Sequence, residues 1–101
     1  MRIIVVLHPT NKRGTKISYT NFRNRLLANG FVLMAPEIFM KISTNRKSAK
    51  VQVERIAPFA PDTGVIRVLL LTEKQHRNMM YLVGEPDYQE QKVGGHCHVS
   101  L

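Results

Sequence analysis

Two strongly apolar runs, the first of them continuous, constrain the fold of this chain more than any other feature of its sequence. Residues 3–7 read Ile-Ile-Val-Val-Leu, and residues 65–71 form the second run. Both have the length of a strand, and apolar, β-branched residues without alternation are typical of a strand covered on both faces. Neither run approaches the ~20 apolar residues of a membrane span. The sequence therefore predicts a buried strand at residues 3–7, a second strongly apolar strand at residues 65–71, and no membrane segment.

A helical pattern follows the first of these strands. Tyr19, Phe22 and Leu26 recur at helical spacing within residues 15–29, and Gly30 stands where a left-handed C-terminal cap is expected. Aromatic residues at this spacing are typical of a buried helix face rather than of a base-stacking surface.

The rest of the chain continues as strand, strand, helix and strand. Residues 31–34 and 37–42 are strand-like, with Pro36 as a break between them, and a second helix is expected from about residue 45 to residue 57. The run at residues 65–71 comes next. A short apolar stretch at residues 80–83 predicts one further strand.

The order β-α-β-β-α-β is that of an α+β, ferredoxin-like domain, in which both helices cover one face of a four-stranded antiparallel sheet. We assign this domain to residues 1–86, and a polar tail to residues 87–101. The uncovered sheet face would carry apolar side chains from both strong strands. We therefore expect a homodimer, in which a second copy of the chain covers that face.

Charge is unevenly distributed along the chain. The net charge is +8; residues 1–55 carry eleven Lys or Arg against two Glu, whereas residues 56–101 carry four against five acids. A basic half of this strength attracts nucleic acid by counterion release. The single Cys97 excludes an internal disulfide framework, so we expect a reducing, cytoplasmic location.

Several segments, in order and at near-constant spacing, resemble one known family. They are MRIIVVL at 1–7, FRNRLLANGF at 22–31, NRKSA at 45–49, VIRVL at 65–69, TEKQ at 72–75 and LVGE at 82–85. Together these segments are similar to the small CRISPR-associated acquisition protein, the Cas-two family, in the form that accompanies type II systems. The resemblance covers residues 1 to about 92.

The resemblance implies a ferredoxin-like homodimer that bridges two dimers of the larger CRISPR integrase subunit and holds a short duplex of foreign DNA. Members of the family are also described as magnesium-dependent endonucleases of RNA or DNA. That activity is ascribed to an Asp at the end of the first strand in each protomer.

His8 occupies the position of this Asp in the present chain, and residues 1–36 contain no acidic side chain. Magnesium prefers hard oxygen ligands, whereas a neutral imidazole supplies nitrogen and no negative charge. We therefore expect no catalytic residue and no resident metal, and a scaffold role that needs only shape and charge. The alternative is a metal-dependent nuclease, or an RNA-cleaving toxin of the same fold.

Six basic residues are the candidates for phosphate contacts: Lys12, Arg13, Lys16, Arg46, Lys47 and Lys50. The first three belong to the loop and helix start after the first strand, where the family's loop faces DNA. The last three share one face of the second helix, for which Ser43 or Thr44 is the expected N-cap. Such contacts would position DNA without reading its sequence, although basic residues on a loop or helix also serve solubility alone.

Two other interpretations of the sequence remain open. His96, Cys97 and His98 could supply soft metal ligands, but no second cluster completes a zinc site. A small-molecule-binding regulatory domain of the same fold would show no salt-dependent affinity for DNA.

Overall fold

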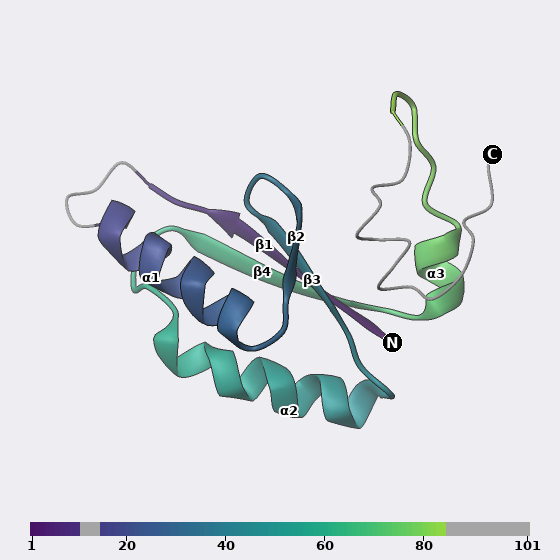
Figure 1. Ribbon diagram of the computed structural model, residues 1–101, viewed down its shortest axis with the longest axis horizontal. Helices are drawn as coiled ribbons and strands as arrows, with labels where there is room; N and C mark the ends of the chain where they lie inside the picture. Colours follow the sequence, from purple (N-terminus) through teal and green to yellow (C-terminus); the bar gives the residue numbers. More distant parts are fainter. Residues whose placement is uncertain (11–14, 85–101) are drawn as a thin grey trace.

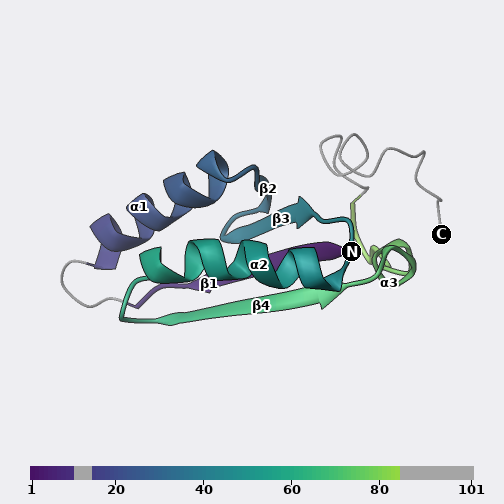
Figure 2. The same ribbon diagram turned by 90° about the horizontal axis from the view of Figure 1, so that it is seen from below.

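The computed structural model describes residues 1–10 and 15–84 of the 101-residue chain. It contains a four-stranded antiparallel sheet in the order β2-β3-β1-β4, with α1 and α2 together on one face (Figures 1 and 2). The elements are β1 Arg2–His8, α1 Thr15–Ala28, β2 Val32–Ala35, β3 Ile38–Ile42, α2 Arg46–Ile56, a 3₁₀ turn Ala57–Phe59, β4 Val65–Leu71 and α3 Glu73–Arg77. This architecture confirms the predicted α+β, ferredoxin-like fold.

β1 lies between β3 and β4 and supplies the centre of the core. Val5 pairs with Phe39 of β3 on one side and with Val68 of β4 on the other. Because successive side chains of a strand point to opposite faces, Ile3, Val5 and Leu7 face the helices, and all three are buried. The continuous apolar run of the sequence thus fills both sides of the central strand.

α1 contributes the largest buried side chains. Tyr19, Phe22 and Leu26 lie on the helix face that packs on the sheet, where they join Phe31 and Phe39 in one cluster. Each of these side chains contributes about 1.5–3 kcal/mol through removal of apolar surface from water. The predicted assignment of the aromatic residues to the core is confirmed.

The end of α1 is fixed by backbone and side-chain hydrogen bonds. Gly30 has a φ of +87°, and the Phe31 amide donates to the Leu26 carbonyl at 3.0 Å. The Lys41 ammonium donates to the Asn29 carbonyl at 2.5 Å. The predicted left-handed cap is present, and β3 holds the end of the helix from the side.

The turn between β2 and β3 contains a non-glycine residue in the left-handed region. Glu37 has a φ of +66°, and its carboxylate accepts two hydrogen bonds from Arg23 of α1, each of 2.8 Å. The Leu7 amide also donates to the Glu37 carbonyl at 2.8 Å. These hydrogen bonds hold the strained residue in place and attach the turn to both α1 and β1.

α2 begins one residue later than the sequence indicated. Its N-cap is Asn45, whose side-chain oxygen accepts from the Ser48 amide at 2.8 Å. The predicted caps Ser43 and Thr44 were therefore wrong. Ser43 is buried and its hydroxyl donates to the Asn45 carbonyl at 3.3 Å, which orients the residue that forms the cap.

The strand predicted at residues 80–83 is absent. This stretch has no regular secondary structure, and its apolar side chains are exposed, Leu82 at 96% and Val83 at 93%. A strand needs a neighbour for its ladder of hydrogen bonds. In the described part of the chain neither edge of the sheet pairs with this stretch. The apolar pattern is present as expected, but residues 80–83 form no strand in the single chain.

The described residues end at 84, so the domain boundary expected at residue 86 stays a prediction. Within the described ranges, no helix combines the length and the apolar character that a membrane crossing requires.

Candidate nucleic-acid interface

The end of β1 is held in place by the turn that precedes β4. The buried Tyr19 hydroxyl donates to the Thr63 carbonyl at 2.7 Å. Burial and the nearby Glu37 carboxylate raise the pKa of Tyr19, which keeps this donor protonated. Gly64 follows with a φ of +77°, close against the His8 carbonyl. The last residue of β1 therefore has a fixed backbone position.

His8 is exposed at this strand end and pairs with Val65 across the ladder. Since Ile3, Val5 and Leu7 face the helices, His8 faces the opposite side of the sheet. A single imidazole beside an apolar strand partner is a poor donor set for magnesium, which requires several hard oxygen ligands. Among the described residues no three His, Cys, Asp or Glu side chains lie close enough to share an ion. The residues at this position do not fit the metal that the resemblance implies.

The predicted phosphate contacts fall into separate places. Lys12 and Arg13 lie outside the described residues. Lys16 is exposed in the first turn of α1, near the end of β1, whereas Arg46 and Lys47 are exposed in the first turn of α2 (Figures 1 and 2). The two helices run in opposite directions, so these turns lie at opposite ends of the helix layer.

The electrostatics of these two turns are unusual. Neither α1 nor α2 has an acidic residue in its first turn, and each has at least one basic residue there. The N-terminus of a helix carries partial positive charge, so Asp or Glu is favoured there by about 0.3–1 kcal/mol and a cation is disfavoured. Lys16, Arg46, Lys47 and Lys50 make no side-chain hydrogen bond or ion pair with any described residue. These positions are poor for helix stability and well suited to an anion.

Two further basic side chains escaped the sequence analysis. Lys74 and Arg77 are exposed on α3, at the end of the sheet opposite His8 (Figure 1). The sequence offered a signal, since Thr72 and Gln75 form a capping box that starts a helix. If the capping box is overlooked, residues 72–79 are interpreted as a polar connector, and the position of Lys74 and Arg77 on one helix is missed.

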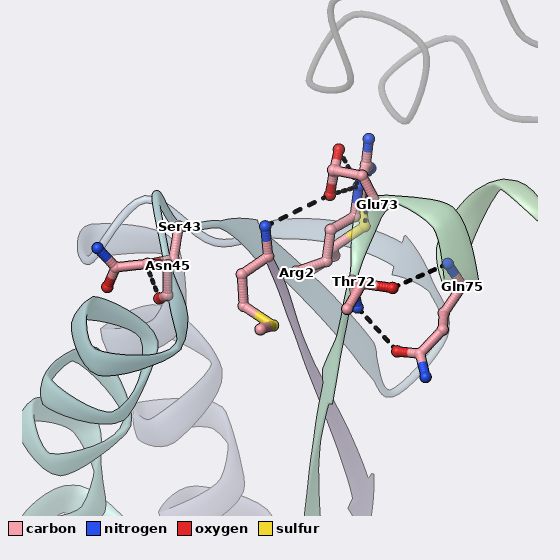
Figure 3. A network of polar contacts seen from close by, with 8 residues as sticks. Arg2, Ser43, Asn45, Thr72, Glu73 and Gln75 are labelled. Atoms are coloured by element: carbon pink, nitrogen blue, oxygen red, sulfur yellow. Dashed lines mark hydrogen bonds and ion pairs between the residues drawn. The ribbon is translucent and has the colours of Figure 1, made fainter.

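A partly buried ion pair connects α3 to the start of β1 (Figure 3). The Arg2 side chain is only 5% exposed, and its Nε lies 3.1 and 3.3 Å from the two Glu73 oxygens. Arg2 also donates to the Met40 sulfur at 3.4 Å, across the sheet. Burial alone would raise the pKa of Glu73, but the hydrogen bonds and charge of Arg2 outweigh it, and the pKa lies below its ordinary value.

The side of the sheet opposite α1 and α2, which we term the open face, is uneven. At the Arg2 end Ile4 and Met40 are buried, and the ion pair helps to cover them. On the edge strand β4 the face is uncovered, with Leu69, opposite Ile4, exposed at 52% and Val65, opposite His8, exposed at 42%. The expected apolar surface is therefore present, mainly on β4.

Comparison with known proteins finds no matching family model, but several relatives. A protein of Ligilactobacillus salivarius strain UCC118 is 33% identical over 86 residues, which are 84% of this chain and 85% of the relative. One from Acidovorax ebreus strain TPSY is 34% identical over 94 residues, 92% of each chain. One from Streptococcus mutans serotype c strain UA159 is 33% identical over 88 residues, 86% of this chain and 81% of the relative. All three are named CRISPR-associated endoribonuclease Cas2.

Proposed function

This chain belongs to the CRISPR-associated Cas2 family, and on that premise we propose that it is a DNA-binding scaffold subunit of the spacer-acquisition complex. In this role a homodimer bridges dimers of the larger CRISPR integrase subunit and holds the prespacer duplex. The proposal includes a cytoplasmic location and needs no catalytic residue in this chain.

The observation that carries the proposal is the basic first turn of each helix. Lys16 lies in the first turn of α1, and Arg46 and Lys47 lie in the first turn of α2, with Lys50 one turn further. All four are exposed and have no anionic partner among the described residues. A duplex supplies phosphates along its whole length, so it can contact cations that stand far apart on one layer. A small anionic ligand could reach only one of the two turns.

The homodimer is supported by the two exposed apolar regions. The open face presents Val65 and Leu69, while the stretch at residues 80–83 exposes Leu82 at 96% and Val83 at 93%. A chain of this size cannot leave both regions in water without a risk of aggregation. Packing residues 80–83 of each copy on the open face of the other would cover both regions, as strand exchange does in many small dimers.

The binding experiment is a titration of the full-length chain with duplex DNA of unrelated sequences at several salt concentrations. We expect similar affinities for all sequences and a steep loss of affinity with salt. Replacing Lys16, Arg46, Lys47 and Lys50 by Ala should weaken binding to every duplex. It should also reduce the slope of log K against log salt by about 0.9 for each phosphate that is no longer neutralised.

The matched control removes two cations elsewhere, Lys74→Ala with Arg77→Ala on α3. This control separates the effect of where the cations lie from the effect of net charge. If the fourfold variant and the control bind alike at all salt concentrations, the helix layer is not the DNA-binding surface.

A second candidate function comes from the name of the relatives, which describes an endoribonuclease. His8 argues against that activity here, because it offers neither the charge nor the hard oxygen that repays the dehydration of magnesium. We expect the purified chain to leave single- and double-stranded RNA and DNA intact with magnesium or manganese, as it does with chelator. Cleavage that requires metal, elutes with the protein and disappears on substitution of one of its residues would favour the nuclease.

A further inference from the structure

Phe59 is a large aromatic side chain that the fold places outside the core. It ends the 3₁₀ turn Ala57–Phe59, in which Pro58 prevents α2 from continuing and the Ala60 amide donates to the Ala57 carbonyl at 3.1 Å. No residue of this turn is buried, and Phe59 is 46% exposed. A single exposed ring is common on protein surfaces, so the surroundings of Phe59 decide what it can do.

Two arginines accompany this ring. The Arg25 guanidinium, in the last turn of α1, lies 3.8 Å from the centroid of the Phe59 ring. Arg55 belongs to the last turn of α2, which runs directly into the 3₁₀ turn. Since residues four apart lie on one side of a helix, Arg55 and Phe59 share a side. Both arginines are exposed.

A third cation lies beneath the helix layer. The Lys41 ammonium of β3 donates to the Asn29 carbonyl at the end of α1, at 2.5 Å, and lies 5.8 Å from the Phe31 ring. Burial lowers the pKa of Lys41, and the neighbouring charge of Arg55 lowers it further. The two cations therefore repel each other, and an anion bound to Arg55 would relieve this repulsion.

The nearby acids do not neutralise these cations. Glu54 and Asp62 flank the segment in sequence, and neither makes an ion pair or a hydrogen bond with any residue that the structure describes. The C-terminal ends of the helices carry partial negative charge, which stabilises Arg25 and Arg55 without occupying all their N–H donors. The result is an exposed ring beside unpaired guanidinium groups, which is the chemistry that binds a base beside a phosphate.

We propose that Phe59, Arg25 and Arg55 form a site for single-stranded DNA, in which one base stacks on Phe59 and the adjacent phosphate binds Arg55. Arg25 holds the ring from its other side. A base inside a duplex is paired and stacked, so it cannot use this site, which therefore goes beyond the duplex contacts proposed above. The choice of DNA rests on that proposed function. Lys47 stands about 12 Å along the same helix, so an unpaired strand leaving a duplex bound there would reach Phe59.

The first experiment uses a reporter at the site. The chain contains no tryptophan, so Phe59→Trp introduces a single indole whose fluorescence reports on stacking. The full-length variant is titrated with single-stranded oligothymidylate, oligouridylate, an abasic DNA strand of the same length and a blunt DNA duplex. We expect oligothymidylate to quench the emission, because a stacked base quenches an indole. The abasic strand and the duplex should leave the emission unchanged, since neither offers a free base.

The second experiment measures affinity for oligothymidylate at several salt concentrations. Phe59→Ala should weaken binding roughly 5- to 150-fold. Arg55→Ala should reduce the slope of log K against log salt by about 0.7, the value for one phosphate of a single strand. The matched controls are Leu33→Ala on β2, which is 48% exposed, and the exposed Arg77→Ala on α3, and both should bind as the parent does. Circular dichroism establishes that each variant is folded during the titration.

The outcomes separate this inference from the proposed function. Emission that stays constant while oligothymidylate binds overturns the site, even if the duplex binds as proposed. Equal quenching by the abasic strand reduces the site to a phosphate contact and overturns the stacking. Stronger quenching by oligouridylate than by oligothymidylate overturns the assignment to DNA. Quenching by oligothymidylate in a chain that binds no duplex supports the site and overturns the proposed function instead.

Discussion

Gly64 is the residue whose replacement should disturb this structure most for its size. Its φ of +77° lies in the left-handed region. A Cβ there would lie 2.7 Å from the His8 carbonyl oxygen and would also meet the Tyr19 hydroxyl. The turn thus packs backbone against the end of β1 and against the buried tyrosine that holds Thr63. Only glycine meets both demands.

We expect Gly64→Ala to lower the free energy of unfolding by about 2–5 kcal/mol. Roughly 1–2 kcal/mol comes from the left-handed backbone, and about 1–3 kcal/mol from overpacking. Gly84→Ala is the matched control, because Gly84 has a φ of +93° and no atom within 4 Å of an added Cβ. Urea denaturation of both variants measures the difference. Equal losses would mean that the close packing at Gly64 contributes nothing.

Residues were predictable from the sequence where spacing alone decides their environment. The period of Tyr19, Phe22 and Leu26 identified the buried face of α1 because a helix repeats every 3.6 residues. The Asn45 cap and the left-handed Glu37 were missed. Both depend on which of several adjacent polar residues meets a particular partner, and that choice is made by the tertiary structure.

Among the elements, α3 depends most on the ion pairs that Glu73 makes with Arg2 and with the N-terminal ammonium of Met1. It is one and a half turns long, too short to be stable alone, and no residue in it is buried. The capping box at Thr72 starts it, and the Arg2–Glu73 pair fastens it to β1. The attachment of α3 to β1 therefore depends on the charge of the Glu73 carboxylate.

The Arg2–Glu73 ion pair, which attaches α3 to β1, should weaken at acidic pH. The folded-state pKa of Glu73 is below the ordinary value of 4.5. The stabilisation from this group is therefore fully present above pH 4.5 and is lost as the pH falls through the lowered pKa. In thermal unfolding between pH 3 and pH 7, Glu73→Gln should lower the melting temperature near neutrality and flatten its fall toward acid. Glu54→Gln serves as the control, and an identical pH profile in the parent and Glu73→Gln would contradict the role of the pair.

The sequence correctly predicted the elements that bury one face against other parts of the same chain. β4 has the predicted bounds, Val65–Leu71, and both long helices lie within about two residues of theirs. The error at residues 80–83 has a different origin. Alternation and apolarity show that a segment will be covered, but they do not show whether the cover is the same molecule.

For the whole molecule, the sheet divides two surfaces. The basic turns of α1 and α2 belong to the helix layer, and the apolar patch of β4 belongs to the open face (Figure 2). A dimer formed through the open face leaves the helix layers of both copies available to one long polyanion. Assembly should therefore strengthen DNA binding, because two linked basic layers hold the same duplex.

A chain that ends at Asn78 tests this coupling. Removing the exposed apolar stretch at residues 80–83 should weaken the dimer and, through it, the affinity for long duplexes. Light scattering measures the first effect and DNA titration the second. Circular dichroism should show that the truncated chain keeps its secondary structure. A truncated dimer as tight as the parent would move the dimer interface elsewhere on the molecule.

The register of β1 with β4 also determines how the chain unfolds under a pulling force. Arg2 lies opposite Leu71, so β4 leaves the sheet beside the point where β1 enters it, and β4 is an edge strand. An unfoldase that pulls on the chain after residue 77 first breaks the Arg2–Glu73 pair. It then peels β4 away one ladder bond at a time, instead of shearing all of them together. The strand that carries the exposed apolar patch is thus the first to leave the sheet under a pulling force, and a second copy packed on it would slow this step.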